Sequence, residues 1–379
     1  MGKFKRLKKE INNIALLVSI VAILSGIIYI SVDYNKGYTE NVNVDIQDYD
    51  YKKADNEFIK LNSIIPFKKA LTNLNWLDEN LLVSYLKDNN YELSLIDIEN
   101  NKEDVIISKD KESIFYGEIY ISPSKEHIIY GRDTGEISKW NSPKIEYYSY
   151  NIKDNSVNQI GSNFRVLEWM YDSSGFVGVE GNEIFSYDLE EKEHRILYKL
   201  TDREYLKSVN FSSDGNNLYM LISQDSNQNL LNKIEKYELK SKQVDTIFKS
   251  QYIDSFELIN DENILIQGYM GDISELFVYN IKNQELRSLG ITNLYQVYLS
   301  PDKTKLITLH FNEKHENTIE IYDINGKEDI IEASYLGKIS LSKGIVHLAI
   351  NSENQLACVG RSNSDNGIII YTYNILNKN

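Results

Sequence analysis

Histidines and carboxylates are the residues of this chain that could do chemistry, and one short segment concentrates them. His310 and His315 flank Glu313, and imidazole and carboxylate groups are common ligands of zinc. The spacing of five residues between the two histidines matches no familiar metal motif. Solvated loop histidines are therefore the simpler interpretation. The other three histidines lie in or beside strand-like segments, where a structural role is expected.

No other set of reactive residues stands out. The sequence has no Gly-x-Ser-x-Gly elbow, Walker loop, His-Glu-x-x-His motif or EF-hand spacing. Cys358 lies in a strand-like segment, which is typical of a small buried residue and not of a nucleophile. Asp45, Asp48 and Asp50 could attract calcium weakly, but they are better explained as part of a soluble linker. We therefore expect no cofactor and no metal, and the chain is not predicted to be an enzyme.

Composition excludes several classes of protein. The 379 residues include 41 Lys and Arg against 56 Asp and Glu, a net charge of −15, and a single Cys. One cysteine rules out an internal disulfide framework. The acidic balance argues against a nucleic-acid partner, because phosphate contacts need a basic face. With 42% hydrophobic residues the chain can form a real core.

The first 32 residues predict a membrane anchor. Residues 1–10 carry five basic side chains and one acid, and residues 11–32 carry no charge. A helix of 22 residues is about 33 Å long, enough to cross a hydrocarbon core of about 30 Å. A cleaved signal peptide is the alternative, but no small-x-small site follows the apolar run. The basic tail should stay in the cytoplasm, which makes this a single-pass cell-membrane protein with the rest of the chain outside.

Residues 33–56 predict a polar stalk between this anchor and the remaining residues, 57–379. The first ten residues carry a charge of +4, so the rest of the chain carries −19. The basic residues that could interact with the membrane therefore belong to the anchor, and the part beyond it is strongly acidic.

Residues 57–379 are built from repeats. An apolar or aromatic residue, then Asp, Asn or Glu, then Ile or Leu recurs seven times, about every 46 residues. The central residues of the seven copies are Asp97, Asn151, Asp188, Glu238, Asn280, Asp323 and Asn374. Upstream of this pattern lie turn sequences such as Ser300-Pro301-Asp302-Lys303, flanked by alternating apolar runs. Four strands per repeat at this period are typical of propeller blades, designated A to D from the inside out.

The Ser-Pro-Asp turn and the Tyr-Asp-Ile strand together resemble the WD40-like repeats of TolB-type propellers. The resemblance implies an all-β propeller fold. The seven copies of the pattern predict a seven-bladed β-propeller, with six or eight blades as alternatives. It says little about function, because propellers serve many roles. The last repeat lacks an outer strand, and the apolar stretch 58–65 belongs to no repeat. We therefore predict that this stretch supplies the missing strand and closes the ring.

Variable B–C loops are the predicted binding surface. Their lengths differ most between repeats, with loops predicted at 132–143, 224–232, 311–317 and 361–367, whereas the A–B turns are short and repetitive. Variable loops on a rigid scaffold commonly carry function. Trp140 is the best single candidate for an exposed contact, although it could instead pack on a neighbouring blade. The candidate binding residues on this loop face are Arg132, Trp140, His310, His315 and Arg361.

Two functions are compatible with these features. The first is a membrane-anchored binding or scaffold module for a protein, peptide or glycan. The second is a propeller-type hydrolase or lyase with its site in the central channel, where residues from several blades would converge. A cluster of titratable groups or a metal in the channel would favour the enzyme. An aromatic loop face would favour the binding module.

Overall fold

The computed structural model describes residues 57–377 with internal gaps at 68, 88–89, 101, 109–113, 138–142, 227–228, 271–272, 312–316, 328–329, 342–346 and 362–367. The predicted cytoplasmic tail (1–10), transmembrane segment (11–32) and polar stalk (33–56) lie outside the described residues. The described part of the chain contains no helix of the length and apolar character that a membrane span requires.

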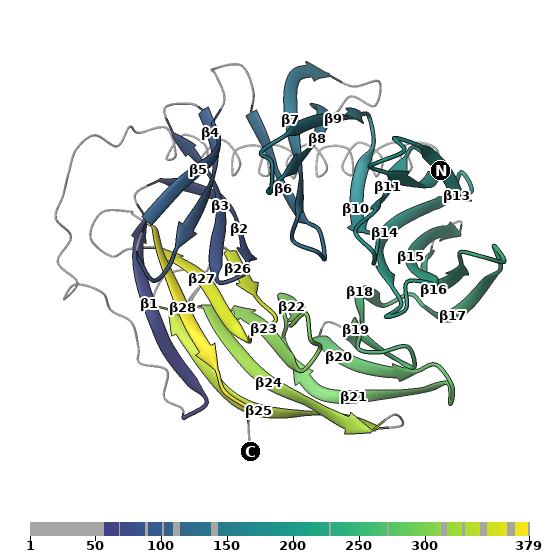
Figure 1. The fold of residues 1–379 in the computed structure, drawn as a ribbon. Helices are drawn as coiled ribbons and strands as arrows, with labels where there is room; N and C mark the ends of the chain where they lie inside the picture. The colour runs from purple at the N-terminus through teal and green to yellow at the C-terminus, as the bar shows by residue number, and fades with distance from the viewer. Residues whose placement is uncertain are drawn as a thin grey trace, which may run out of the picture. The chain divides into compact units, whose positions relative to one another are not determined.

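Seven antiparallel sheets of four strands form the described part of the chain. Figure 1 shows them arranged around a centre, with β2, β6, β10, β14, β18, β22 and β26 innermost. The prediction of a seven-bladed β-propeller is therefore confirmed.

The strands of the first four blades have these bounds: β2 Ala70–Leu77, β3 Asn80–Lys87, β4 Asn90–Asp97, β5 Lys102–Ser108; β6 Ile114–Ile121, β7 His127–Ile137, β8 Pro143–Asn151, β9 Val157–Ser162; β10 Arg165–Trp169, β11 Gly175–Glu180, β12 Glu183–Asp188, β13 His194–Lys199; β14 Glu204–Phe211, β15 Asn217–Ser226, β16 Asn229–Glu238, β17 Val244–Ser250. The strands of the last three blades are: β18 Ile253–Leu258, β19 Asn263–Met270, β20 Ile273–Asn280, β21 Glu285–Thr292; β22 Gln296–Leu299, β23 Lys305–Phe311, β24 Asn317–Lys327, β25 Ile330–Leu341; β26 His347–Ile350, β27 Gln355–Arg361, β28 Ile368–Ile375 and β1 Ile59–Phe67.

The first strand closes the ring, as the sequence predicted. β1 pairs antiparallel with β28, from Ile59 opposite Ile375 to Phe67 opposite Ile368, and the last blade has the order β1-β28-β27-β26. The N–H of Ser63 also donates to Thr372 Oγ1 at 3.1 Å. Figure 1 shows β1 beside β28, so the two ends of the described chain lie in one blade. The outer edge of β28 is thereby covered, and the last blade is complete.

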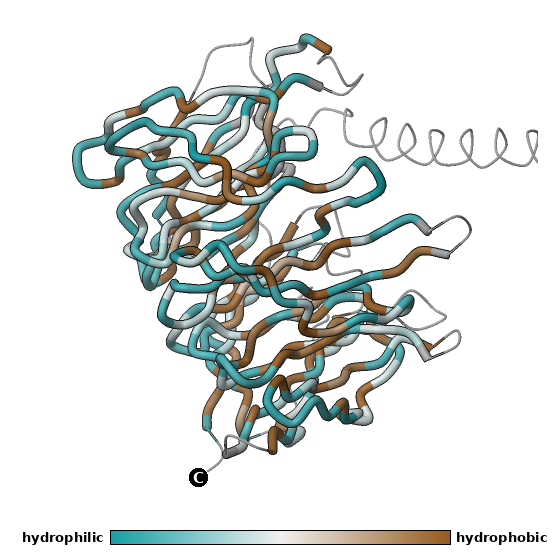
Figure 2. Tube along the Cα trace, turned by 90° about the vertical axis from the view of Figure 1, so that its right-hand side faces the viewer, coloured by the Kyte–Doolittle hydropathy of each residue, from teal (hydrophilic) through white to brown (hydrophobic). Residues whose placement is uncertain are grey.

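The core lies between neighbouring blades. Its buried residues form successive clusters, each of which joins one sheet to the next. Hydrophobic residues follow the strands and hydrophilic ones gather at the turns, as Figure 2 shows. The cluster that joins the first and last blades includes Ile65 and Phe67 of β1 together with Leu74, Tyr85 and Val359.

The A–B turns hold neighbouring blades together on one side of the ring, here named the turn face. Ser213 of one turn donates from its N–H and its hydroxyl to the carboxylate of Asp261 in the next, at 3.0 and 2.8 Å. Lys125 reaches Asp78 at 2.8 Å in the same way. The opposite side, where the inner strands begin, carries the D–A and B–C connections and is named the entry face.

Candidate functional site

The central channel is lined by equivalent positions of the inner strands. In each blade, one inner-strand residue pairs with the third residue of the next strand. The residues at this position are only partly buried, and they lie on the innermost strand of each blade, next to the channel. The seven residues at this level are Asn75, Tyr120, Glu168, Asn210, Glu257, Tyr298 and Ala349. Six of the seven residues are polar, whereas the core between the blades is apolar.

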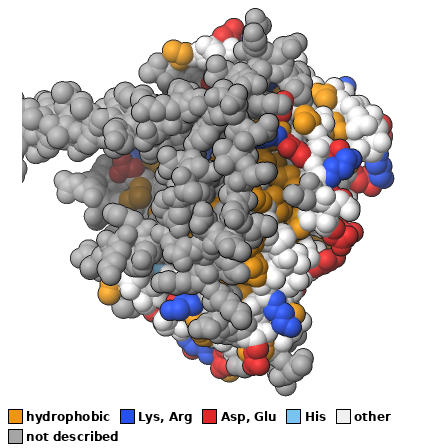
Figure 3. Space-filling model, turned by 90° about the vertical axis from the view of Figure 1, so that its left-hand side faces the viewer, with side chains coloured by type: hydrophobic (Ala, Val, Ile, Leu, Met, Phe, Trp, Pro, Cys, Tyr) orange, Lys and Arg blue, Asp and Glu red, His pale blue; other side chains and the backbone are white. Residues whose placement is uncertain are grey.

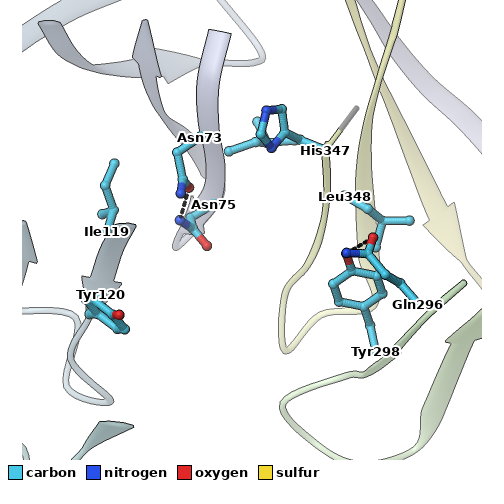
Figure 4. Close-up of a pocket in the computed structure, with 9 residues that line it drawn as sticks. Asn73, Asn75, Ile119, Tyr120, Gln296, Tyr298, His347 and Leu348 are labelled. Atoms are coloured by element: carbon cyan, nitrogen blue, oxygen red, sulfur yellow. Dashed lines mark hydrogen bonds between the residues drawn. The ribbon is translucent and has the colours of Figure 1, made fainter. Parts of the chain in front are cut away.

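A cavity of about 460 Å³ opens from one wall of this channel. Its lining comes from four inner strands, β26, β2, β6 and β22, and Figure 4 shows the side chains around it. The residues are Asn73, Leu74, Asn75, Ile119, Tyr120, Gln296, Tyr298, His347 and Leu348. None of them is a carboxylate, a lysine or an arginine. The volume is within the range of small-molecule sites.

Hydrogen bonds within this cavity wall fix two pairs of side chains. The Asn75 amide donates to Asn73 Oδ1 at 2.7 Å, and the Tyr298 hydroxyl donates to Gln296 Oε1 at 2.9 Å. Burial lowers the pKa of His347 below its usual value, so the imidazole is neutral at neutral pH. The wall therefore offers amides, phenols and a neutral imidazole, all without formal charge.

The facing wall of the channel is acidic. Glu168 and Glu257 lie on β10 and β18, two blades apart, and Lys303 from an A–B turn is 3.9 Å from Glu257. The pKa of Glu168 is raised to about 7, first by desolvation and then by the charge of Glu257, while Lys303 and a backbone hydrogen bond act in the opposite direction. Desolvation also raises the pKa of Glu257. Two carboxyls in one enclosed channel thus hold their protons more strongly than exposed ones would.

The raised pKa of Glu168 predicts a loss of stability with increasing pH. The unfolded chain releases this proton near the ordinary value of about 4.3, whereas the folded protein releases it near 7. The contribution to stability is complete below the lower value and is lost as the pH rises through 7. Between pH 5 and pH 8 the melting temperature of Glu168→Gln should therefore fall less than that of the wild type. Glu190→Gln, at an exposed glutamate, is the matched control; equal pH profiles for all three proteins would contradict the assignment.

Exposed tyrosines lie on the entry face at three neighbouring blades, where the inner strands begin. Tyr205, Tyr252 and Tyr295 lie at or just before the start of the inner strands of three successive blades and are 59%, 58% and 56% exposed. Tyr269 lies beside Tyr252, whose carbonyl accepts its N–H at 2.9 Å, and is also exposed. We call these four residues the tyrosine rim. On the turn face, Tyr171 is a comparably exposed tyrosine, at 59%.

The predicted binding residues are only partly within the described structure, and those described lie in strands. Arg132 lies inside β7, with its guanidinium carbon 5.8 Å from the centre of the Tyr148 ring, so it is not the start of a loop. His310 lies in β23, where Nε2 is 2.8 Å from Thr308 Oγ1 and 3.4 Å from Glu320 Oε2. Arg361 ends β27, and its side chain lies outside the described part. Trp140 and His315 also lie outside it.

The B–C connections are shorter than the sequence predicted. The predicted loop at 132–143 is shorter than expected, because β7 continues to Ile137 and β8 begins at Pro143. Strands B and C extend toward the entry face in the same way in the fourth blade, where the predicted loop 224–232 shrinks to two residues between β15 and β16. The structure brings Arg132 and His310 to no common site among the described residues.

The expectations for Cys358 and for metal ligands can be compared with the described residues. Cys358 is fully buried, and burial raises the pKa of its thiol, as expected of a structural residue. The described residues contain no group of three or more His, Cys, Asp or Glu side chains placed to hold a metal ion. His347, which was expected to be structural, instead lines the cavity.

Comparison with known proteins gives similarity at the level of structure alone. Neither a protein-family model nor a curated protein matches this sequence. Among solved structures, the propeller domain of the Trilobed protease from Pyrococcus furiosus is 15% identical, with 83% of this chain and 97% of that chain covered and a TM-score of 0.57. An oligogalacturonate lyase in complex with manganese is 11% identical, with 70% and 74% covered and a TM-score of 0.50.

TolB from Acinetobacter baumannii is 13% identical, with 76% of this chain and 78% of that chain covered and a TM-score of 0.42. At these identities similarity shows the fold alone, and the chain is a seven-bladed β-propeller. It differs from the Pyrococcus furiosus domain, which is described as having an open velcro topology. Here β1 and β28 pair and close the ring.

Proposed function

We propose that the chain is a membrane-anchored, extracytoplasmic binding or scaffold module that engages its partner through the entry face. The tyrosine rim is the observation that carries this proposal. Tyrosine provides a large contact area at low cost in side-chain entropy, and it is enriched at the centres of protein interfaces. The four rim tyrosines lie on the side of the ring where the sequence placed the variable loops. The anchor rests on the basic and apolar segments of residues 1–32.

Charges support a protein or peptide partner and argue against nucleic acid. The chain beyond residue 10 carries −19. Among the described residues visible in Figure 3, acidic and basic side chains are interspersed. Asp202 and Asp254 lie close in sequence to rim tyrosines. A partner with a basic or neutral surface fits this rim better than an acidic one.

Replacing the rim tyrosines should abolish partner recovery without unfolding the protein. The variant Tyr205→Ala/Tyr252→Ala/Tyr295→Ala would be compared with the wild type by crosslinked pull-down of the full-length protein from native membranes. Because exposed tyrosines at a binding centre contribute about 2 kcal/mol or more each, the triple variant should recover the partner at less than about a tenth of the wild-type yield. Tyr171→Ala, on the turn face, is the control and should recover it fully. Equal recovery by both variants would reject the entry face as the binding surface.

A hydrolase or lyase with a channel site is the second candidate, because Glu168 has the raised pKa that suits a general acid at neutral pH. An anionic substrate would meet the acidic wall of the channel, so a neutral one fits better. Turnover of a small substrate that Glu168→Gln abolishes and the tyrosine triple variant retains would favour this candidate over the binding module.

A further inference from the structure

We propose that the cavity in the channel wall binds a neutral saccharide. The cavity shares none of its lining with the tyrosine rim; its polar groups are Asn73, Asn75, Tyr120, Gln296, Tyr298 and His347. The inference rests on the proposed binding role, for which it names a ligand class.

The hydrogen-bonding groups of the cavity suit sugar hydroxyls. A hydroxyl both donates and accepts, and a side-chain amide presents an acceptor and two donors that can bond adjacent hydroxyls. After the bonds within the wall are made, Asn75 Oδ1, Gln296 Nε2 and both ring nitrogens of His347 have no hydrogen-bond partner among the described residues. Two acceptors and two donors are thus available, because a neutral imidazole supplies one of each. These groups come from β2, β22 and β26 and surround one volume, as Figure 4 shows.

Aromatic and apolar groups complete the site. The rings of Tyr120 and Tyr298 and the side chains of Ile119 and Leu348 lie among the amides. A pyranose ring has apolar C–H faces as well as hydroxyl edges, so it needs a surface of this mixed kind. A mostly apolar ligand would displace water from the amides and leave them without hydrogen-bond partners, which is costly.

Charge selects a neutral ligand. The cavity wall itself has no charged side chain, and the groups that face it across the channel are Glu168 and Glu257, with Lys303 beside Glu257. An anionic sugar would find no arginine or lysine in the cavity, and the ionised fraction of the two carboxyls would repel it. A cationic sugar would find no carboxylate within hydrogen-bonding reach in the lining. A neutral saccharide avoids both penalties.

The test uses the full-length protein in a detergent without a sugar headgroup, because a maltoside would compete for the site. Binding of maltose, cellobiose and diacetylchitobiose is measured by saturation-transfer NMR and calorimetry. Glucosamine and digalacturonate are the charged comparators. At least one neutral disaccharide should bind, and each charged comparator should bind at least about tenfold more weakly.

Single substitutions then locate the site. Asn75→Ala and Gln296→Ala should each weaken the binding about tenfold, since each removes hydrogen bonds worth roughly 1.4 kcal/mol. Gln243→Ala removes an exposed amide in the turn before the outer strand β17 and should leave the affinity unchanged. Tight binding of a charged comparator, no binding of any neutral disaccharide, or equal affinity in Gln296→Ala would each overturn the proposal. Retained partner recovery together with absent saccharide binding would reject this site and leave the rim function intact.

Discussion

Deleting residues 58–65 is expected to lower the melting temperature of the propeller by roughly 10 °C or more. The deletion removes the buried side chains of Ile59 and Ile65, and burial of an isoleucine contributes about 1.5–3 kcal/mol. It also removes most of the β1–β28 ladder and exposes the edge of β28. Since domains are stable by only about 5–15 kcal/mol, the loss is a large part of the total.

A deletion of equal length in the predicted stalk, residues 38–45, is the matched control and should leave the melting temperature unchanged. Differential scanning calorimetry of both full-length variants measures the difference. A peptide of residues 57–67 added to the shortened protein should restore part of the stability, because it can pair with β28 in the position of β1. If both deletion variants had the melting temperature of the wild type, the closing strand would not contribute to stability.

The repeat pattern was sufficient to predict the blades, and the structure explains why. The middle residue of the Tyr-Asp-Ile pattern pairs with the first residue of strand B: Asn151 with His127, Glu238 with Asn217, and Asp323 with Lys305. Both residues are polar and lie next to the A–B turn. The local sequence therefore marks where two strands begin and end, and a sevenfold repetition of a local rule determines the whole fold.

The candidate site was missed because its residues converge only in space. Glu168 and Glu257 are 89 positions apart in the sequence, and no spacing rule joins them. A signal was nevertheless present, because the channel residue lies two positions before the Ser-Pro-Asp turn, as Tyr120 does before Ser122 and Tyr298 before Ser300. Aligning the repeats on their turns would have placed these residues in one ring. Loop length, by contrast, is a local feature, and it pointed to residues such as Arg132 that the structure places in strands.

His347 illustrates the same limit. Its sequence neighbours are apolar, which predicts a buried strand residue and a structural role. The residue does begin the inner strand β26, but the inner strand of a propeller blade borders both the core and the channel. Which of the two a side chain faces depends on the register of the whole blade. The alternation of side chains along a strand identifies its two faces but does not tell which of them borders the channel.

The largest effect of a single substitution is expected at Lys305. This lysine is only 1% exposed; its Nζ lies 2.7 Å from Asp323 Oδ1 and donates to Asn377 Oδ1 at 2.6 Å. Lys305→Met keeps most of the side-chain volume but leaves the carboxylate of Asp323 buried without its cation. Removing one partner of a buried ion pair lowers the free energy of unfolding by about 3–5 kcal/mol. The midpoint of urea unfolding should decrease accordingly.

Two further variants separate the ion pair from the packing around it. The double variant Lys305→Met/Asp323→Leu should recover much of the stability lost by the single one, because no unpaired charge remains in the core. Lys199→Met breaks an ion pair with Glu183 at 2.9 Å in which the side chains are 64% and 33% exposed, and it should cost about 0–1 kcal/mol. Equal losses for Lys305→Met and Lys199→Met would show that the buried pair does not stabilise the blade. A double variant less stable than the single one would show that Lys305 and Asp323 contribute more through hydrogen bonds, including the one to Asn377 near the C-terminus, than through compensation of charge.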